Sequence, residues 1–401
     1  MARDVDVLHA ALARAPAALF SFDPRIATGW LSDRYFVRGA ETLAHAGLDP
    51  HVTVQVFAKR QGVLAGVHEA VRLIETQLRP HADGRPRDPA GCVRVETLLE
   101  GDAIEPWETA MLLHAPYRVI AHLETPLLGT LARRSLVATN VRRVIDAARG
   151  KTVIFMGARH DDWRVQTADG YAAQVGGVRQ VSSDAGGAWW GARGVGTMPH
   201  ALIAAFGGDV VAATLAFARY VRDREPDVAV VGLVDYDNDV VADSLAVARA
   251  MRDAFGPGAL SGVRVDTSER LVDRSREGVT PEPGERLHGV TPRLVRVLRA
   301  RLDAEGFGDV GVVVSGGFTP TRIAAFEAAG VPVMAYGIGS SLLGHNRGEA
   351  DGLLTSFDFT ADVVSVDGRP QSKVGRALRP SPRLVPLDWA RLRHLDAAAS
   401  A

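Results

Sequence analysis

The stretch at 311–344, GVVVSGGFTPTRIAAFEAAGVPVMAYGIGSSLLG, contains the same pattern twice. Each half is an apolar run, rich in β-branched residues, that ends at glycines. The runs are 312–314 and 331–336, and the loops that follow them hold Ser315, Gly316, Gly317, Gly337, Gly339 and Ser340. Such runs are typical of buried parallel strands, and residues 321–329 between them have a helical composition. The stretch therefore predicts a βαβ unit.

Glycines directly after a strand indicate a binding site for an anion, most often a phosphate. Without a Cβ, the backbone approaches a ligand closely, and the N–H groups at the start of the next helix point toward it. In (β/α)₈ barrels, such a site is often built from the loops after the last two strands. Either loop alone is equally well explained as a tight turn. Two loops in succession favour a sugar-phosphate site.

Strand and helix patterns also alternate upstream of this stretch. Candidate strands lie at 153–155, 180–181, near Val195, at 228–234 and at 262–265, and candidate helices lie at 201–206, 209–222, 240–255 and 292–304. Repeated strand–helix units predict a parallel sheet with crossover helices. Seven or eight such units favour a barrel.

Both ends of the chain have a different pattern. The segment 52–59 alternates like a half-buried strand, short β segments follow from Val93, and β-like pieces return after Ser356. We predict an α/β barrel catalytic domain over 127–355. A smaller β-rich α+β domain is expected to combine 1–126 with 356–401.

The composition describes an ordinary soluble chain. Of 401 residues, 47% are apolar and 23% charged, and the formal net charge of −1 gives no field that favours nucleic acid or anionic lipid. Cys92 is the single cysteine, which excludes an intrachain disulfide and a cysteine-based metal cluster. We find neither an N-terminal apolar segment nor a run of eighteen apolar residues. A cytoplasmic enzyme is the expectation.

Polar residues or glycine follow every predicted strand, where a barrel places its chemistry. In chain order these are Arg159 and His160, Ser182 to Asp184, Thr197 to His200, Asp235 to Asp239, Arg264 to Ser268, and the two glycine loops. Arginine forks suit phosphate or carboxylate, whereas aspartates suit ribose hydroxyls or Mg²⁺ held through water. A metal site of protein ligands alone is not expected, because no two histidines have ligand spacing. For His200, a structural role and a catalytic role are equally well supported.

These residues resemble the nicotinate phosphoribosyltransferases, including nicotinamide-using relatives, over about 31–373. The most specific segment is GTMPHAL at 196–202, which is similar to the family's GT-x-x-H motif. The segments 100–102, 262–266, 315–317 and 337–340 match in order and spacing. The resemblance implies a type II phosphoribosyltransferase: an irregular (β/α) barrel, joined to a β-rich domain made from both termini, in a homodimer with shared active sites.

The resemblance also implies a reaction. Phosphoribosyl would pass from phosphoribosyl pyrophosphate to the ring nitrogen of nicotinate, a pyridine carboxylate. The products would be nicotinate mononucleotide and pyrophosphate, in NAD biosynthesis and salvage. Mg²⁺ would accompany pyrophosphate, and ATP would be a co-substrate that phosphorylates a histidine.

The family's roles carry over onto matching positions. His200 would be phosphorylated, Arg264 would meet the pyridine carboxylate or the phosphates, and Asp266 would meet the ribose. Asp235 would hold ribose hydroxyls or magnesium pyrophosphate, and Arg159 would contact phosphate near the ring. The 5-phosphate would be held by Gly316, Gly317, Gly339 and Ser340. Tyr35, with Asp33, would reach in from the partner subunit, and the tyrosine would stack on the pyridine.

Two departures leave the base open. Met156 stands where the family often has an aromatic that sandwiches the ring, and Ser182, Ser183 and Asp184 replace its usual Thr-Ser-Asn or Thr-Asp-Thr segment. A carboxylate there would repel nicotinate and favour an uncharged or cationic base. The alternatives for the base are nicotinamide or quinolinate. Two alternatives do not depend on the base: a non-catalytic phosphate-sensing relative on the same scaffold, and a flavin or glycolytic barrel enzyme with the same glycine loops.

Overall fold

The structure, a computed structural model, describes residues 2–281 and 283–399. It forms two compact units, which we describe one at a time. The first contains the residues up to Thr139 and those from Leu354 onward, and the second contains Asn140–Leu353. The predicted domain boundaries at 126/127 and 355/356 stay a prediction.

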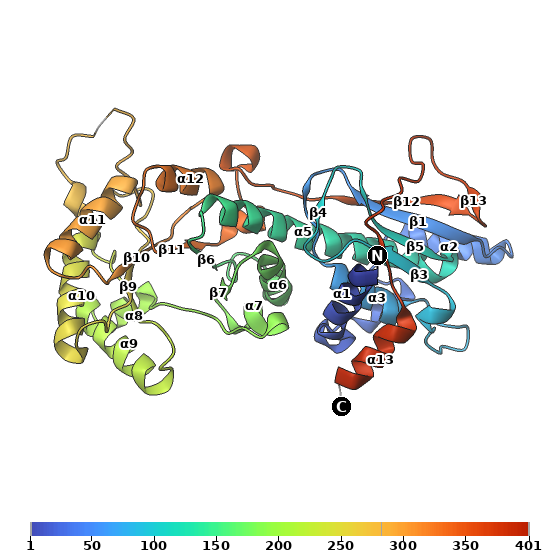
Figure 1. The fold of residues 1–401 in the computed structure, drawn as a ribbon, viewed down its shortest axis with the longest axis horizontal. Helices are drawn as coiled ribbons and strands as arrows, with labels where there is room; N and C mark the ends of the chain where they lie inside the picture. Colours follow the sequence, from blue (N-terminus) through green and yellow to red (C-terminus); the bar gives the residue numbers. More distant parts are fainter. Residues whose placement is uncertain (1, 282, 400–401) are drawn as a thin grey trace. The chain divides into compact units, whose positions relative to one another are not determined.

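The first unit is built on an antiparallel sheet that both ends of the chain supply (Figure 1). Its order is β13-β12-β1-β5-β3-β14, with β1 (His51–Ala58), β3 (Arg94–Thr97), β5 (Thr109–Pro116), β12 (Phe359–Val366), β13 (Arg369–Pro370) and β14 (Val385–Pro386). Val54 faces Val363 on one side and Leu113 on the other. The predicted strand at 52–59 and the return of the C-terminal segment to this unit are confirmed.

Helices bury the apolar side chains of this sheet. They are α1 (Ala2–Ala13), α2 (Arg34–His45), α3 (Val67–Gln77), α4 (Tyr117–Ile120) and α13 (Trp389–Ala399), and a short hairpin pairs β2 (Gly62–Val63) with β4 (Ala103–Ile104). Leu8 of α1, Val71 of α3 and Leu392 of α13 belong to one core with Val95 of β3. The long α5 (Glu124–Ala147) begins in this unit and ends in the second.

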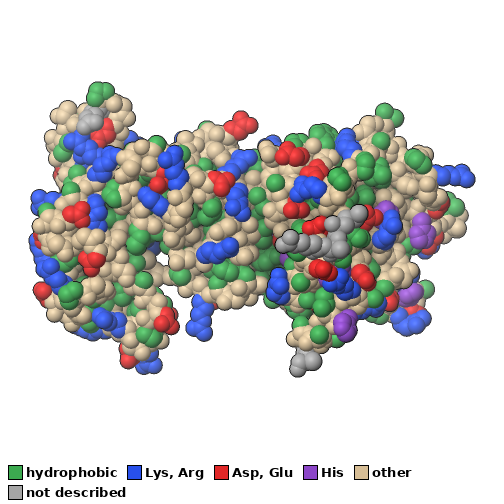
Figure 2. All heavy atoms as spheres, viewed as in Figure 1, with side chains coloured by type: hydrophobic (Ala, Val, Ile, Leu, Met, Phe, Trp, Pro, Cys, Tyr) green, Lys and Arg blue, Asp and Glu red, His purple; other side chains and the backbone are tan. Residues whose placement is uncertain are grey.

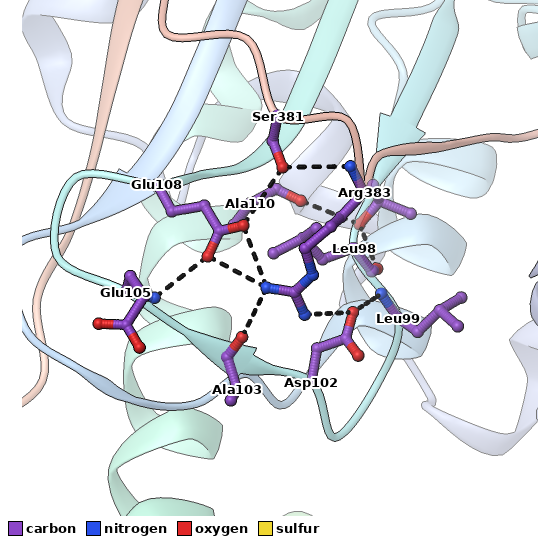
Figure 3. Close-up of polar contacts among 10 residues, drawn as sticks. Leu98, Leu99, Asp102, Ala103, Glu105, Glu108, Ala110, Ser381 and Arg383 are labelled. Carbon is purple, nitrogen blue, oxygen red and sulfur yellow. Dashed lines mark hydrogen bonds and ion pairs between the residues drawn. The ribbon is translucent and has the colours of Figure 1, made fainter.

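Arg383 ties the C-terminal segment to the hairpin before β5 (Figure 3). Its Nη1 donates to the Ala103 carbonyl at 2.9 Å and to Glu108 Oε1 at 3.1 Å, and its Nη2 lies 3.2 Å from Asp102 Oδ2. Ser381 Oγ also donates to Glu108 Oε1. Because Glu108 is mostly buried and Arg383 is only partly exposed, water screens this network less than it screens an ion pair on the surface.

We expect Arg383→Met to destabilise the protein by about 1–2 kcal/mol, because it leaves the Ala103 carbonyl and Glu108 without their shared donor. Urea unfolding measures the change. Arg85→Met is the matched control, since Arg85 forms an exposed ion pair with Asp83 and should change stability little. Equal effects in the two variants would contradict the role of the network.

Glu124, the first residue of α5, faces a small apolar hollow lined by Val54, Leu113 and Leu127. Burial, and secondarily the charges of Asp362 and Asp33, raise the pKa of Glu124 to about 8. An unfolded chain would release this proton near pH 4.5. Between about pH 4.5 and pH 8, the Glu124 carboxyl is therefore protonated in the folded state and ionised in the unfolded state.

The contribution of Glu124 to stability should thus be complete below about pH 4.5 and decline as the pH rises through about 8. We expect Glu124→Gln, which stays neutral, to flatten the fall in unfolding free energy between pH 5 and about pH 8. Urea unfolding at a series of pH values measures it. Glu41→Gln, at an exposed position of α2, is the control, and an unchanged slope for Glu124→Gln would refute the assignment.

The second unit contains an open sheet of six parallel strands. Its order is β7-β6-β11-β10-β9-β8, with β6 (Thr152–Phe155), β7 (Gln180–Val181), β8 (Val231–Leu233), β9 (Gly262–Val265), β10 (Gly311–Val314) and β11 (Ala335–Ile338). Helix α12 (Pro320–Ala328) connects the parallel neighbours β10 and β11, so the predicted βαβ unit is confirmed. The irregular barrel is likewise confirmed, since β7 and β8 end the sheet without pairing to each other in the described residues.

Two details of the prediction were wrong. The segment near Val195 forms only an isolated bridge, between Val181 and Gly194, because short helices and glycine-rich turns occupy this part of the chain. The last strand also starts at Ala335 rather than Val331. As a result Gly337 lies inside β11, where it pairs with Ile154, and not in the loop after it.

Helices α9 (Val210–Arg224), α10 (Val240–Phe255) and α11 (Pro292–Ala304) gather around the β8–β10 part of the sheet (Figure 1). The others in this unit are α6 (Gln166–Gly176), α7 (Asp184–Gly187) and α8 (His200–Ala205). Basic and acidic side chains are mixed over the face in Figure 2, as the net charge near zero predicts. Among the described residues, no helix combines the length and hydropathy needed to cross a membrane.

Candidate active site

The register of the parallel sheet brings three predicted site residues to one edge. Leu233 pairs with Arg264, and Val265 pairs with Val314. Asp235, Asp266 and Ser315 therefore follow β8, β9 and β10 at the same level. Beneath them Ile154, Val231, Val313 and Ala335 form a buried apolar cluster. The edge that follows the carboxyl ends of these strands is the candidate active site.

His200, the first residue of α8, is joined to Asp235 at this edge. Its Nε2–H donates to Asp235 Oδ1 at 3.0 Å. The hydrogen bond to Asp235 raises the pKa of His200, and the nearby carboxylate of Asp266 acts in the same direction. Asp235 is almost fully buried, whereas the imidazole is about half exposed. This arrangement fixes the ring by Nε2 and leaves Nδ1 without a hydrogen-bond partner in the described residues.

Arg264, next to the last residue of β9, brings a positive charge to the same edge. Its Nη1 donates to Thr197 Oγ1 at 2.7 Å, which ties β9 to the segment before α8. Its Nε is buried and has no hydrogen-bond partner among the described residues. Burial lowers the pKa of Arg264, and the charges of Asp266 and Asp235 partly offset this effect. The guanidinium thus has donors available for an anion.

The glycine loop after β10 lies against Asp266. Gly316 and Gly317 have φ values of +88° and +67°, a left-handed conformation in which other residues are strained. A Cβ on Gly316 would lie 3.1 Å from Asp266 Oδ1. Because neither residue carries a Cβ, the backbone of this loop can approach a ligand closely.

Arg322, which the sequence analysis missed, supports this loop from α12. Its Nη1 donates to the Gly316 carbonyl at 2.6 Å and the Gly317 carbonyl at 3.1 Å, and its Nη2 donates to the Val290 carbonyl. Burial lowers the pKa of Arg322 to about 10, so the side chain stays charged at neutral pH. The only sequence signal was its place in the first turn after the N-capping Thr319.

Two buried hydroxyls, just after the neighbouring strands β9 and β10, add donors at this edge. Ser315 Oγ and Thr267 Oγ1 have no hydrogen-bond partner within the described residues, and both side chains are at most 5% exposed. Buried polar groups nearly always have a hydrogen-bond partner. Two hydroxyls without one, beside the glycine loop, therefore suit a ligand with several oxygens.

The loop after β11 is packed tightly against β6 and its following loop. A Cβ on Gly337 would lie 2.8 Å from Met156 Sδ, and one on Gly339 would lie 2.7 Å from the His160 ring. Gly339 precedes the short helix Ser340–Leu343, so Gly339 and Ser340 are in the predicted loop whereas Gly337 is not. Arg159 is exposed, yet its charge contributes to lowering the pKa values of both His160 and Arg264.

The segment after β7 has its own hydrogen bonds. Ser183 Oγ accepts from Gly186 N at 3.2 Å as the N-cap of α7, and it donates to Gln166 Oε1 at 3.3 Å. Asp184 Oδ1 accepts from Gly194 N at 2.8 Å. Asp184 therefore closes a glycine-rich turn, a role that the sequence analysis did not foresee.

Tyr35 and Asp33 belong to the first unit. Asp33 precedes α2 and is bonded to Thr125, whose Oγ1 accepts from its backbone N–H at 3.0 Å and donates to its Oδ2 at 3.1 Å. Tyr35 is 65% exposed and contacts Phe36. Their predicted role across a dimer interface stays a prediction.

Over the described part of the chain, no group of three or more His, Cys, Asp or Glu side chains is placed to hold a metal ion. Asp235 and Asp266 nevertheless put two carboxylates at the edge that carries the Gly316 loop. This donor set fits Mg²⁺ that arrives bound to a phosphate ligand, because that ion keeps several waters and needs few protein oxygens.

Comparisons with known proteins agree with this fold. Residues 33–135 match the family model described as "Quinolinate phosphoribosyl transferase, N-terminal domain". A structure of nicotinate-nucleotide pyrophosphorylase from Pyrococcus furiosus has 25% identity and a TM-score of 0.74, covering 95% of this chain and 96% of that one. Human nicotinic acid phosphoribosyltransferase has 20% identity and a TM-score of 0.61, covering 86% and 77%. The fold is that of a type II phosphoribosyltransferase.

Two curated relatives from Mycobacterium tuberculosis extend the comparison. Nicotinate phosphoribosyltransferase pncB2 is 29% identical over 295 residues, which cover 71% of this chain and 55% of that protein. Nicotinate phosphoribosyltransferase pncB1 is 29% identical over 374 residues, covering 86% and 74%. The chain thus spans about half the length of the first relative. It is a homologue of proteins named nicotinate phosphoribosyltransferase, and the resemblance seen in the sequence is confirmed.

Proposed function

We propose that this chain is a nicotinate phosphoribosyltransferase. It transfers phosphoribosyl from phosphoribosyl pyrophosphate to the ring nitrogen of nicotinate, giving nicotinate mononucleotide and pyrophosphate for NAD biosynthesis and salvage. The observation that carries the proposal is the His200–Asp235 pair on the same sheet edge as Arg264, Asp266 and the Gly316 loop. We place the enzyme in the cytoplasm, as a homodimer with shared active sites.

The transfer itself needs little acid–base chemistry, because pyrophosphate leaves and the pyridine nitrogen attacks the anomeric carbon. Positioning and electrostatics then supply most of the rate. The Gly316 loop and Ser340 hold the 5-phosphate, and Asp266 holds the ribose. Arg264 binds the pyridine carboxylate or the phosphates, and Mg²⁺ supplies charge neutralisation on the leaving pyrophosphate.

The His200–Asp235 pair suits ATP coupling. Since Nε2 is held by Asp235, Nδ1 is the nitrogen that attacks the γ-phosphorus of ATP, forming a P–N bond as the bond to ADP breaks. Asp235 then stabilises the positive charge that develops on the ring. Phosphorylation of His200 adds negative charge beside Arg264, which favours a closed arrangement around the substrate.

The test is pyrophosphate release from phosphoribosyl pyrophosphate with nicotinate, nicotinamide or quinolinate, each with and without ATP. Turnover of nicotinate that ATP stimulates is the expected result. Quinolinate is included because the matching N-terminal family model is named for it. Activity with another base alone would make Met156 and the 182–184 segment the residues that select it. No activity, together with no binding of phosphoribosyl pyrophosphate in calorimetry, would leave a non-catalytic relative.

Gly316→Ala should raise KM for phosphoribosyl pyrophosphate about tenfold, through roughly 1–2 kcal/mol of left-handed strain and the crowding of Asp266. Gly306→Ala is the matched control: Gly306 also has a positive φ, of +77°, but a Cβ there would meet nothing within 4 Å. Steady-state kinetics and thermal melting of both variants separate the two effects. If both variants lose stability and neither changes KM, the loop does not bind the substrate.

A further inference from the structure

The first unit contains a basic hollow of about 430 Å³ that the proposed function does not use. Three arginines line it, Arg79, Arg87 and Arg118, together with one carboxylate, Asp49. They come from separate elements: Arg79 and Arg87 follow α3, Arg118 lies in α4, and Asp49 precedes β1. The volume is within the range of pockets that hold small ligands.

One of the three arginines is held by a side-chain hydrogen bond, and none of them forms an ion pair in the described residues. Arg87 Nε donates to the Arg79 carbonyl at 2.7 Å, and Arg79 N donates to the Val119 carbonyl at 3.2 Å, so backbone contacts join the loop to α4. Arg118 Nε is buried and has no hydrogen-bond partner among the described residues. Arg383 in the same unit differs, because it forms an ion pair with Glu108.

The charge of the hollow is therefore unbalanced. Three guanidinium groups and one carboxylate give a formal charge of +2. No ion pair within 4 Å joins Asp49 to any of the three arginines in the described residues, so the positive charges remain available. Like charges in partly buried positions repel, and an unpaired charge is costly to bury, so this arrangement has an electrostatic cost. A bound anion removes that cost.

We propose that this hollow is a binding site for an oligophosphate anion, either inorganic pyrophosphate or the phosphate chain of a nucleotide. Arginine forks bind phosphate oxygens bidentately, and a ligand with two or more linked phosphates can reach guanidinium groups from three elements at once. Ala27, Pro80, Ala82 and Val119 also line the hollow, so part of its wall is apolar. The site lies in the first unit, so it does not depend on the catalytic role of the second.

Calorimetric titration of the full chain with pyrophosphate tests this. We expect two classes of site in the wild-type protein. The double variant Arg79→Gln/Arg118→Gln should lose one of them, with binding weakened roughly a hundredfold, at about tenfold for each charge-assisted contact removed. Arg264→Met should lose the other. If the double variant binds pyrophosphate with unchanged stoichiometry and affinity, the proposal is wrong. If the wild-type protein shows the class that depends on Arg79 and Arg118 but no class that depends on Arg264, the result counts against the proposed function and supports this site.

Two further variants keep the test decisive if the double variant is unstable. Asp49→Asn removes the one repelling charge and should tighten pyrophosphate binding roughly two- to fivefold, an effect that misfolding cannot mimic. Arg85→Gln, on the same loop but outside the hollow and paired with Asp83, should leave binding unchanged. No tightening with Asp49→Asn would contradict the site.

Parallel titrations identify the ligand chemistry. Pyrophosphate and ATP should both bind. Tighter binding of pyrophosphate would identify the inorganic anion as the ligand, and tighter binding of ATP would identify a nucleotide. Succinate, a dianion without phosphate, should bind at least about tenfold more weakly, because only phosphate offers each fork three oxygens. Succinate binding as tight as pyrophosphate would overturn the assignment to oligophosphates.

Discussion

Replacing Arg264 with methionine is expected to lower kcat/KM for phosphoribosyl transfer by about 10²–10³. Its guanidinium is mostly buried at the end of β9, with Nη1 on Thr197 and with Nε unpaired in the described residues. A charge-assisted contact to a substrate anion in such a site contributes about 2.7–4 kcal/mol to transition-state stabilisation. Methionine keeps much of the volume and removes the positive charge that interacts with Asp266 and Asp235.

Two variants control the Arg264 measurement. Arg264→Lys keeps the charge but not the fork, so its kcat/KM should fall between those of wild type and Arg264→Met. Arg249→Met removes an exposed arginine of α10 that pairs with Glu305, and should leave the kinetics unchanged. Wild-type kcat/KM in Arg264→Met, with unchanged melting temperature, would exclude Arg264 from the site.

His200→Ala should abolish the stimulation by ATP, lowering the rate measured with ATP at least about tenfold while the ATP-independent rate survives. Acid-labile phosphate from γ-labelled ATP should no longer appear on the protein. The exposed His45, at the end of α2, gives the matched His→Ala control. ATP stimulation at the wild-type level in His200→Ala would disprove the phosphohistidine.

Asp235→Asn tests the role of the carboxylate that is hydrogen-bonded to His200. That hydrogen bond is the largest cause that raises the pKa of His200, so the variant should lower this pKa. The nucleophile is the unprotonated ring. The acid limb of the ATP-dependent profile should therefore move to lower pH, while the maximal rate falls because the developing positive charge loses its counter-ion. An unmoved acid limb would show that another group sets it.

The sequence predicted the arrangement of the second unit well because its signals are local. Short apolar runs located β9 and β10 correctly, and the places of Asp235 and Asp266 directly after predicted strands put them on one edge. Where the signals were weaker, the prediction failed. The run at 331–336 is interrupted by Pro332, so apolar character alone marked the strand four residues too early.

What the sequence could not reveal depends on contacts between distant segments. Arg322 binds carbonyls of two loops, and nothing near it in the chain distinguishes it from a surface arginine. Asp184 looked like a repulsive group for an anionic base, yet its carboxylate accepts the Gly194 N–H. The basic hollow likewise collects arginines that are separated by up to thirty-nine positions, from Arg79 to Arg118. Such juxtapositions follow from the tertiary fold.

The sheet of the first unit also sets the order in which this protein can mature on the ribosome. Strand β1, near the N-terminus, has β5 on one side and β12 on the other, and β3 pairs with the still later β14. During synthesis, the entire second unit emerges before these last strands do. Until then one edge of β1 and one edge of β3 carry unpaired backbone groups, which are templates for wrong strand pairing. The first unit can therefore complete its sheet only when translation has reached β12 and β14.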